Sequence, residues 1–154
     1  MIHLQPQTWE EICRHAQDTF PEECCGAILH RAGVEEVRRI TNVQNVMHAK
    51  DPQRYPRDAT TAYVGDSREL LRLNEEIESG KVTLQAFYHS HPHHDAYFSA
   101  EDKVQALGWD DEPSYPGVAH LVISIYDRQV RVIRAYLWDE KVKDFIETPL
   151  STNV

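Results

Sequence analysis

Hydrophobic residues recur along the chain at two spacings, one typical of helices and the other of strands. Apolar positions three to four residues apart predict an opening helix from about Trp9 to Thr19. Thr8 and Glu11 form a capping-box pattern at its start, and Pro21 follows its end. The N-terminal part of the chain is therefore expected to begin with an amphipathic helix.

Two further helices are expected from the same spacing. One begins at a box-like pair, Asp66 and Glu69, and stops at Gly80, which suits the left-handed residue that ends many helices. A shorter helix is expected from Ser99 to near Gly108.

Alternating and continuous apolar runs predict the strands. We expect strands at residues 25–29, before Ile40, near 60–64, and at 81–88, 121–126, 130–137 and 142–148. Turns at Ala32-Gly33 and Asp127-Arg128 join two of the pairs. The mixture predicts an α/β fold with helices packed on one sheet, in a single domain spanning residues 1–154. The polar stretch 41–65 is long for a structureless loop and, outside its strand, is expected to contact substrate.

The charge balance limits the classes of partner. Sixteen basic residues against 25 acidic ones give a net charge of −9, spread along the chain. This balance argues against nucleic acid or an anionic membrane as the main partner. The composition, 41% hydrophobic and 27% charged, is that of a globular protein and excludes a disordered or fibrous chain.

The cysteines and the N-terminus indicate a cytoplasmic protein. Three cysteines, two of them adjacent, make a disulfide framework or a paired structural zinc site a poor description; they are Cys13, Cys24 and Cys25. The first residues lack the basic and apolar regions of a signal peptide. No window approaches the ~18 apolar residues of a membrane span.

The pattern His-x-His-Pro-x6-Ser-x2-Asp carries the clearest chemistry. His89 and His91 lie two apart at the end of a predicted strand, so both side chains point to one face. Asp102 follows in the first turn of the helix that Ser99 is expected to cap. Two imidazoles and a carboxylate match the ligands of a catalytic zinc, which keeps its fourth position open. We therefore expect a zinc site here.

Each part of this pattern also has a simpler interpretation. His-x-His alone is often a polar strand end, and Ser-x-x-Asp before an apolar run is often only a capping box, a role that Ser99 can combine with chemistry. His93 and His94 are interpreted as loop residues, and His120 as a core or edge histidine. The full spacing favours the metal site over these separate readings.

A hydrolytic zinc site also needs a base to take a proton from water and return it to the leaving group. The best candidates are Glu22 and Glu23, at the entry to the first predicted core strand. The residues alone leave open which of the two points inward, and either can simply be a solvated loop residue.

The chain resembles the JAMM metalloproteases, also called MPN+ or JAB proteins, and in particular their small stand-alone prokaryotic members. The family signature, an upstream Glu followed by His-x-His-Pro-x6-Ser-x2-Asp, is complete here. The family's Pro-x-Glu-x-Cys-Gly run is met by Pro21, Glu23, Cys25 and Gly26. The resemblance therefore selects Glu23 over Glu22 as the base. The resemblance covers roughly residues 1–140 and implies a mixed sheet flanked by helices, similar to the cytidine-deaminase-like architecture.

The resemblance also implies an activity. Zinc would be held by His89, His91 and Asp102, Glu23 would act as base and acid, and Ser99 would stabilise the oxyanion. The substrate would be a peptide or isopeptide bond after the C-terminal Gly-Gly of a sulfur-carrier or ubiquitin-like protein, with sulfur-carrier processing expected first.

Two alternatives to this activity remain. One is a deubiquitinase-like isopeptidase that removes a ubiquitin-like modifier from lysine; another, of a different class, is a non-catalytic MPN scaffold, which the intact signature argues against. A homodimer is a further expectation, with Trp9, Trp109 and Trp138 as candidate surface residues.

Overall fold

The computed structural model describes residues 1–152. The helices are α1 (Pro6–Thr19), α2 (Gln44–Lys50), α3 (Ser67–Glu78) and α4 (Ala100–Ala106). The strands are β1 (Ile2–Leu4), β2 (Cys25–Arg31), β3 (Val34–Ile40), β4 (Thr83–Pro92), β5 (Ala119–Tyr126), β6 (Gln129–Asp139), β7 (Asp144–Thr148) and β8 (Leu150–Thr152).

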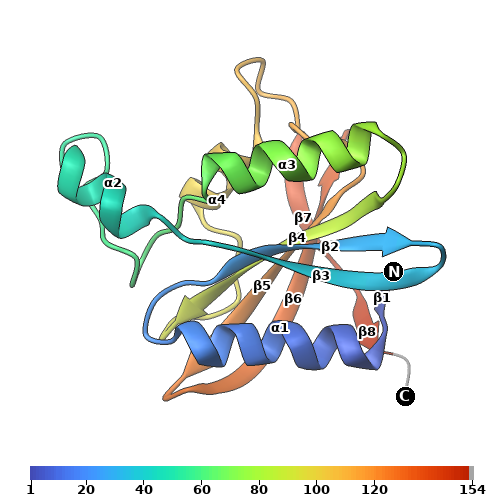
Figure 1. The fold of residues 1–154 in the computed structure, drawn as a ribbon, viewed down its shortest axis with the longest axis horizontal. Coiled ribbons are helices and arrows are strands. Elements are labelled where there is room, and N and C mark those ends of the chain that lie inside the picture. Colours follow the sequence, from blue (N-terminus) through green and yellow to red (C-terminus); the bar gives the residue numbers. More distant parts are fainter. Residues whose placement is uncertain (153–154) are drawn as a thin grey trace.

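A mixed sheet with helices on both faces forms the centre of the fold. Six strands run in the order β3-β2-β4-β5-β6-β7, with β4 and β5 parallel and the other neighbours antiparallel. Helix α1 lies along one face, and α3 and α4 lie on the other (Figure 1). The predicted α/β fold is confirmed.

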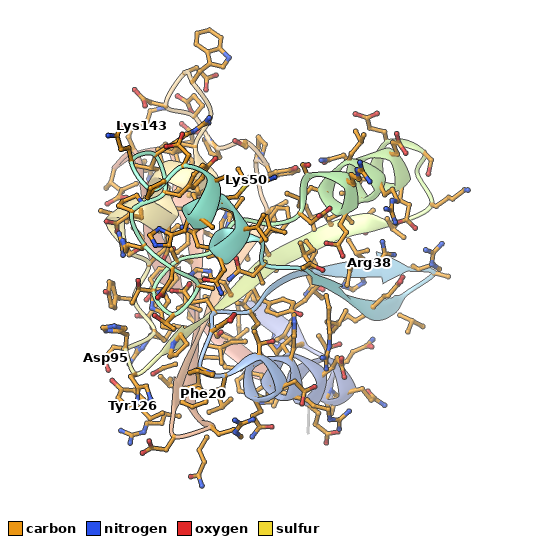
Figure 2. The ribbon with its side chains drawn as sticks, turned by 60° about the vertical axis from the view of Figure 1, so that its left-hand side comes forward. Phe20, Arg38, Lys50, Asp95, Tyr126 and Lys143 are labelled. Carbon is orange, nitrogen blue, oxygen red and sulfur yellow. The ribbon has the colours of Figure 1, made fainter. Side chains whose placement is uncertain are left out.

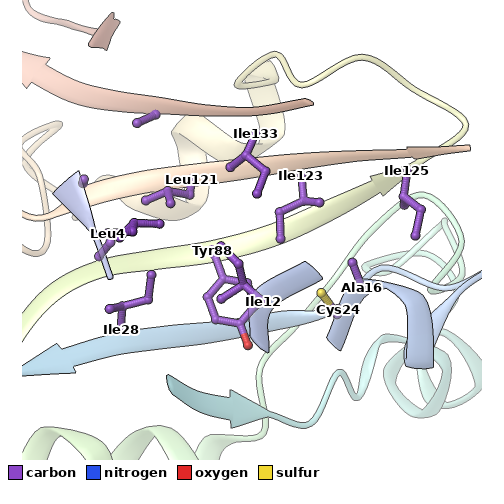
Figure 3. Packing of buried hydrophobic residues seen from close by; sticks show 13 residues of the cluster. Leu4, Ile12, Ala16, Cys24, Ile28, Tyr88, Leu121, Ile123, Ile125 and Ile133 are labelled. Carbon is purple, nitrogen blue, oxygen red and sulfur yellow. The ribbon is translucent and has the colours of Figure 1, made fainter. Parts of the chain in front are cut away.

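Side chains alternate across the sheet and divide it into two different faces. Figure 3 shows the face under α1, where Ile12 of the helix meets Tyr88 of β4 and Leu121 and Ile123 of β5. The opposite face has two smaller apolar clusters, one centred on Leu73 of α3 and the other under α4. The aliphatic α1 face therefore supplies most of the core, while the other face has room for polar chemistry.

The first helix starts earlier than its pattern predicts. Gln5 is its N-cap, without a side-chain hydrogen bond, and Pro6 occupies the first turn. Thr8 is buried inside that turn, so the predicted Thr8–Glu11 capping box is wrong. A proline at the first helical position needs no hydrogen-bonded N–H, and this explains the earlier start.

The polar stretch 41–65 contains a helix in place of the predicted strand. Helix α2 was not expected, and residues 60–64 form no strand; a single bridge pairs Asn42 with Gly65. Polar contacts hold the segment: Gln44 Nε2 donates to the Arg57 carbonyl at 2.8 Å, and Asn45 Oδ1 accepts from the Ala59 N–H at 2.8 Å. Such contacts between distant residues leave no apolar periodicity in the sequence.

Most other expectations hold. Asp66 caps α3 by accepting from the N–H groups of Arg68 and Glu69, and Gly80 follows that helix with φ of 78°. Asp127 and Arg128 form the β5–β6 turn with positive φ. The last predicted strand starts at 144, not 142, and the short parallel pair β1–β8 was not expected.

Two surface observations bear on partners. Among residues 1–152, no helix is long and apolar enough to cross a membrane. Trp109, 98% exposed after α4, is the most exposed of the large hydrophobic side chains in the described part of the chain.

Candidate metal centre

Strand pairing brings the two separated parts of the site together. His89 and His91 lie on the α4 face of β4, while Ser90 between them points to the α1 face. Ser90 Oγ accepts from the Cys24 N–H at 2.8 Å, and the Cys24 carbonyl accepts from the Ser90 N–H at 3.1 Å. With Cys25 opposite His89 in the antiparallel pair, Glu23 enters the sheet beside His91.

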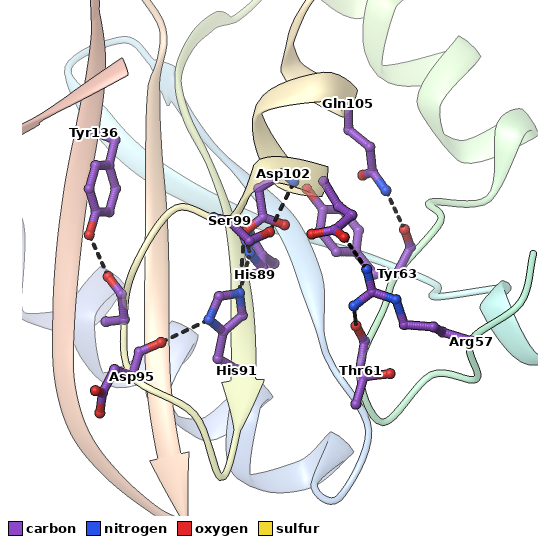
Figure 4. Close-up of polar contacts among 12 residues, drawn as sticks. Arg57, Thr61, Tyr63, His89, His91, Asp95, Ser99, Asp102, Gln105 and Tyr136 are labelled. Atoms are coloured by element: carbon purple, nitrogen blue, oxygen red, sulfur yellow. Dashed lines mark hydrogen bonds and ion pairs between the residues drawn. The ribbon is translucent and has the colours of Figure 1, made fainter. Parts of the chain in front are cut away.

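The motif residues converge on one point (Figure 4). The Nε2 atoms of His89 and His91 lie 3.1 Å apart, and Asp102 Oδ2 lies 3.1 Å from the first and 3.3 Å from the second. All three side chains are buried. The predicted convergence of the two histidines with Asp102 is what the structure shows.

Helix α4 begins with a complete capping box. Ser99 Oγ accepts from the Asp102 N–H at 3.1 Å, and Asp102 Oδ2 accepts from the Ser99 N–H at 3.0 Å. The same carboxylate oxygen therefore caps the helix and faces both imidazoles. Because the Ser99 oxygen accepts the helix bond, its own O–H proton remains available for another acceptor.

Glu23 completes the cluster from the β2 side. One ligand atom each from Glu23, His89 and His91 lies within 4.8 Å of the others, a group able to bind a metal ion. The Glu23 N–H donates to the Ala59 carbonyl at 2.7 Å, and the Glu23 carbonyl accepts from Asn42 Nδ2 at 2.8 Å. These bonds fix its backbone to the segment before α3.

The choice between the neighbouring glutamates is visible in the structure. Glu23 is buried, 5% exposed, and faces the histidines. Glu22 instead accepts a hydrogen bond from Asn45 Nδ2 at 3.1 Å, away from the cluster. The residue selected by the family pattern is the one placed in the site.

The electrostatics of the two carboxyl groups differ. Burial, together with the negative charge of Asp102, raises the pKa of Glu23 to about 9, although Arg57 opposes this shift. Burial alone would also raise the pKa of Asp102, but the neighbouring His89 and His91 and the N–H of Ser99 hold that pKa well below its ordinary value. Burial lowers the pKa of His89. The site thus favours one ionised carboxylate beside neutral imidazole.

The donor set fits a divalent metal such as zinc. His91 Nδ1 lies 2.8 Å from the Asp95 carbonyl, which can only accept, so Nδ1 carries the proton and the Nε2 lone pair faces the cluster. That lone pair meets Asp102 Oδ2, another acceptor, at 3.3 Å. Two acceptors turned toward each other in a buried place are satisfied by a cation between them, and imidazole with carboxylate is a common zinc donor set.

A cleft of about 840 Å³ opens over the cluster. Its lining includes Glu23, His91, Ser99 and Asp102 on the side of the sheet and α4, and the residue ranges 54–57 and 61–64 on the other side. Arg57 pairs with Glu101, and Gln105 Nε2 donates to the Tyr63 carbonyl at 3.1 Å (Figure 4). The polar stretch 41–65 therefore supplies one wall of the cleft, including residues 61–64, which were expected to form a strand.

Comparison with known proteins agrees with this geometry. The family model described as prokaryotic homologues of the JAB domain, Prok-JAB, matches residues 5–139. The chain belongs to the Prok-JAB family. A curated relative, the desampylase of Haloferax volcanii, is 33% identical over 128 residues, covering 80% of each chain.

Solved structures show the same fold. A Desulfitobacterium hafniense protein, DSY2949, matches with a TM-score of 0.70 at 24% identity, covering 99% of this Prok-JAB chain and 93% of that one. The JAB1/MPN domain protein AF2198 of Archaeoglobus fulgidus matches with a TM-score of 0.56 at 14% identity, covering 99% and 97%. At these identities the likeness shows the fold alone.

Several residues of this Prok-JAB site were not expected from the sequence. Tyr63 stacks on His89 with ring centroids 4.7 Å apart, and the Asp95 carbonyl orients His91. Neither could be placed from the sequence: Tyr63 lies in residues 60–64, where the predicted strand does not form, and a backbone carbonyl has no residue preference. Of the remaining histidines, His94 lines the cleft, whereas His120 is buried against Phe98.

Proposed function

We propose that this Prok-JAB protein is a zinc-dependent metallopeptidase that hydrolyses the bond after the C-terminal Gly-Gly of a ubiquitin-like or sulfur-carrier protein. The observation that supports it most directly is the convergence of His89, His91 and Asp102 at 3.1 to 3.3 Å, beside a buried Glu23 and under an open cleft. A scaffold needs none of these buried polar groups, each of which is costly without a function or a partner.

The two histidines and Asp102 are the proposed ligands. Bound zinc supplies Lewis acidity, which polarises a carbonyl group and lowers the pKa of water. His91 presents its Nε2 lone pair because its other nitrogen donates to the Asp95 carbonyl. Asp102 is held by the helix cap, so its carboxylate has little freedom to move.

Glu23 is the proposed general base and acid. The raised pKa of Glu23, about 9 in the metal-free chain, means that its carboxyl group holds a proton that it can give to a leaving amine. The positive charge of a bound metal would lower this pKa, so that the carboxylate could first take a proton from water. Its backbone bonds to Ala59 and Asn42 keep the side chain at the cluster. Ser99, with its O–H proton unused by the helix cap, is the proposed donor to the oxyanion.

The substrate class follows from the relative and from the cleft. The name desampylase describes removal of a ubiquitin-like modifier, which favours an isopeptide bond to lysine. Sulfur-carrier processing, expected first from the sequence, uses the same chemistry on a peptide bond. A Gly-Gly tail suits either case, because without side chains its backbone can approach the buried histidines closely.

The test is intact-mass analysis of two substrates incubated in parallel with zinc-loaded protein. One is a Gly-Gly sulfur carrier with a short C-terminal extension, and the other is the same carrier joined through Gly-Gly to a lysine side chain. The control is the Glu23→Gln variant under identical conditions. Both substrates end at Gly-Gly after cleavage, so the product mass reports the bond cut.

The two substrates separate the alternatives. Loss of the extension alone supports carrier processing, and release from lysine alone supports deconjugation. If neither substrate changes while zinc is bound, the proposed specificity is wrong. Equal cleavage by Glu23→Gln would overturn the role given to that residue.

A further inference from the structure

The segment 92–98, which joins His91 to Ser99, is held by three consecutive backbone carbonyls. The donors come from three adjacent strands: Ser124 Oγ donates to His94 O at 2.6 Å, His91 Nδ1 to Asp95 O at 2.8 Å and the Tyr136 hydroxyl to Ala96 O at 2.6 Å. The bond that orients the histidine is therefore flanked on both sides by bonds from side chains outside the motif.

The two flanking donors are built into the sheet beside the site. Ser124 of β5 is the Cα partner of His91 in the parallel β4–β5 pair, and its side chain is fully buried. Tyr136 of β6 is also buried, and its ring stacks on Phe98 with centroids 5.5 Å apart. Both hydroxyls thus reach the segment from rigid strands.

Asp95 does not hold its own carbonyl in place. Its side chain is exposed and contacts only Tyr126, at 3.4 Å, among the hydrogen bonds of residues 1–152 (Figure 2). The direction of the Asp95 carbonyl is instead set by the two peptide units around it, whose oxygens accept from Ser124 and Tyr136.

The direction of that carbonyl determines what His91 offers to a metal. A carbonyl at 2.8 Å from Nδ1 keeps the proton on Nδ1 and leaves Nε2 as an acceptor. If the carbonyl turns away, the proton is free to occupy either nitrogen, and the ring loses its fixed orientation. Groups that orient a ligating histidine typically change metal affinity by about 10- to 100-fold when they are removed.

We propose that Ser124 and Tyr136 are positioning residues of the metal site, which fix the carbonyls on either side of Asp95 and thereby hold His91 in its metal-binding tautomer and orientation. The part that concerns metal rests on the proposed function. Packing alone would not require the hydroxyls, because alanine or phenylalanine fills nearly the same space without a buried polar group to satisfy.

Zinc affinity of the metal-free chain is the first measurement, by competition with a chromophoric chelator. Ser124→Ala and Tyr136→Phe are each expected to weaken zinc binding by about tenfold, at the lower end of the range for outer groups. The matched control is Tyr88→Phe, which also removes a buried hydroxyl with a 2.6 Å bond, to His15, but on the opposite face of the sheet. It is expected to bind zinc like the unaltered chain.

The His91 tautomer in the metal-free chain is the second measurement, by long-range ¹H–¹⁵N NMR of the imidazole. The unaltered chain should show the proton on Nδ1, and both variants a mixture of tautomers. Unfolding in urea, measured in parallel, identifies any change that comes only from lost stability, which Tyr88→Phe should share.

The outcomes separate this inference from the proposed function. Unaltered zinc affinity and an unaltered His91 tautomer in both variants would overturn the positioning role. Absence of zinc binding by the unaltered chain would overturn the proposed function, while a tautomer mixture in the variants alone would still support the orientation of His91 by these hydroxyls.

Discussion

Ser99 and Asp102 bond each other twice, through the Ser99 oxygen with the Asp102 N–H at 3.1 Å and through Asp102 Oδ2 with the Ser99 N–H at 3.0 Å. Because Asp102 Oδ2 also contacts both histidines, the start of helix α4 and the metal site share one carboxylate oxygen. A change at Ser99 therefore acts on stability and on chemistry together.

Ser99→Ala is expected to lower both the stability of the chain and its turnover, by different amounts. Loss of an N-cap typically costs about 1 kcal/mol of unfolding free energy, while loss of an oxyanion donor costs about 10²–10³ in kcat. Urea unfolding measures the first and turnover of the cleaved substrate measures the second. Ser99→Thr, which keeps a capping hydroxyl, is the control and should recover most of both. Normal turnover with reduced stability would leave Ser99 only the capping role.

Glu23→Gln tests whether Glu23 is a base or a ligand. If Glu23 is a base, zinc binding does not need it, so the variant should keep zinc and lose nearly all turnover. The alternative, that Glu23 is a metal ligand, has structural support, because Glu23 and the two histidines by themselves form a group able to bind a metal. Elemental analysis of the purified variant decides: a large loss of zinc would place Glu23 among the ligands.

His89→Ala and Asp102→Ala are expected to lose zinc and activity together. Each removes a group that lies about one hydrogen-bond length from its partners in the cluster, at 3.1 Å for the pair His89 and Asp102. Zinc content and turnover are measured on the same preparations. Full zinc occupancy in either variant would show that the proposed ligand set is incorrect.

The pH dependence of stability should report the buried His15 in the metal-free chain. Burial, and then the charge of Arg39, lower the pKa of His15 to about 4, against a partial opposing effect of Glu11 and Asp18. Between about pH 4 and 6.5 the unfolded chain binds a proton at this residue that the folded chain does not. Stability should therefore rise with pH in this window, by up to about 1.4 kcal/mol per pH unit from this residue.

His15→Gln removes that contribution. Urea unfolding of both chains at pH 4.5, 5.5 and 6.5, with a chelator present, should show a shallower pH dependence for the variant. Parallel curves for the two chains would mean that His15 is protonated equally in the folded and unfolded states.

The part of the site that could be predicted from sequence is the part governed by local rules. Strand alternation places His89 and His91 on one face, and a helix cap places Asp102 one turn after Ser99. These rules act over a few residues, so the spacing in the sequence carries the geometry. The choice of Glu23 over Glu22 needed the family pattern, because it depends on the pairing of β2 with β4 across more than sixty residues.

The missed elements depend on contacts that leave no periodic pattern. Helix α2 has Val46 exposed, and it is held by Gln44 and Asn45 through bonds to residues after position 56. The pair β1–β8 consists of three-residue strands, too short for an alternation to be recognised. Ser124 and Tyr136 lie in correctly predicted strands, but their bonding partners are backbone carbonyls of a segment without regular structure.

The alternation along β4 also limits how this chain can fail to fold. A slip of one residue in the pairing of β4 would turn His89 and His91 into the aliphatic layer under α1 and bring Tyr88 and Ser90 to the cleft. Two imidazoles without partners in that layer would cost several kcal/mol. His89 and His91 therefore disfavour a shifted strand register, since only the register that brings them to the cleft keeps both imidazoles out of the aliphatic layer.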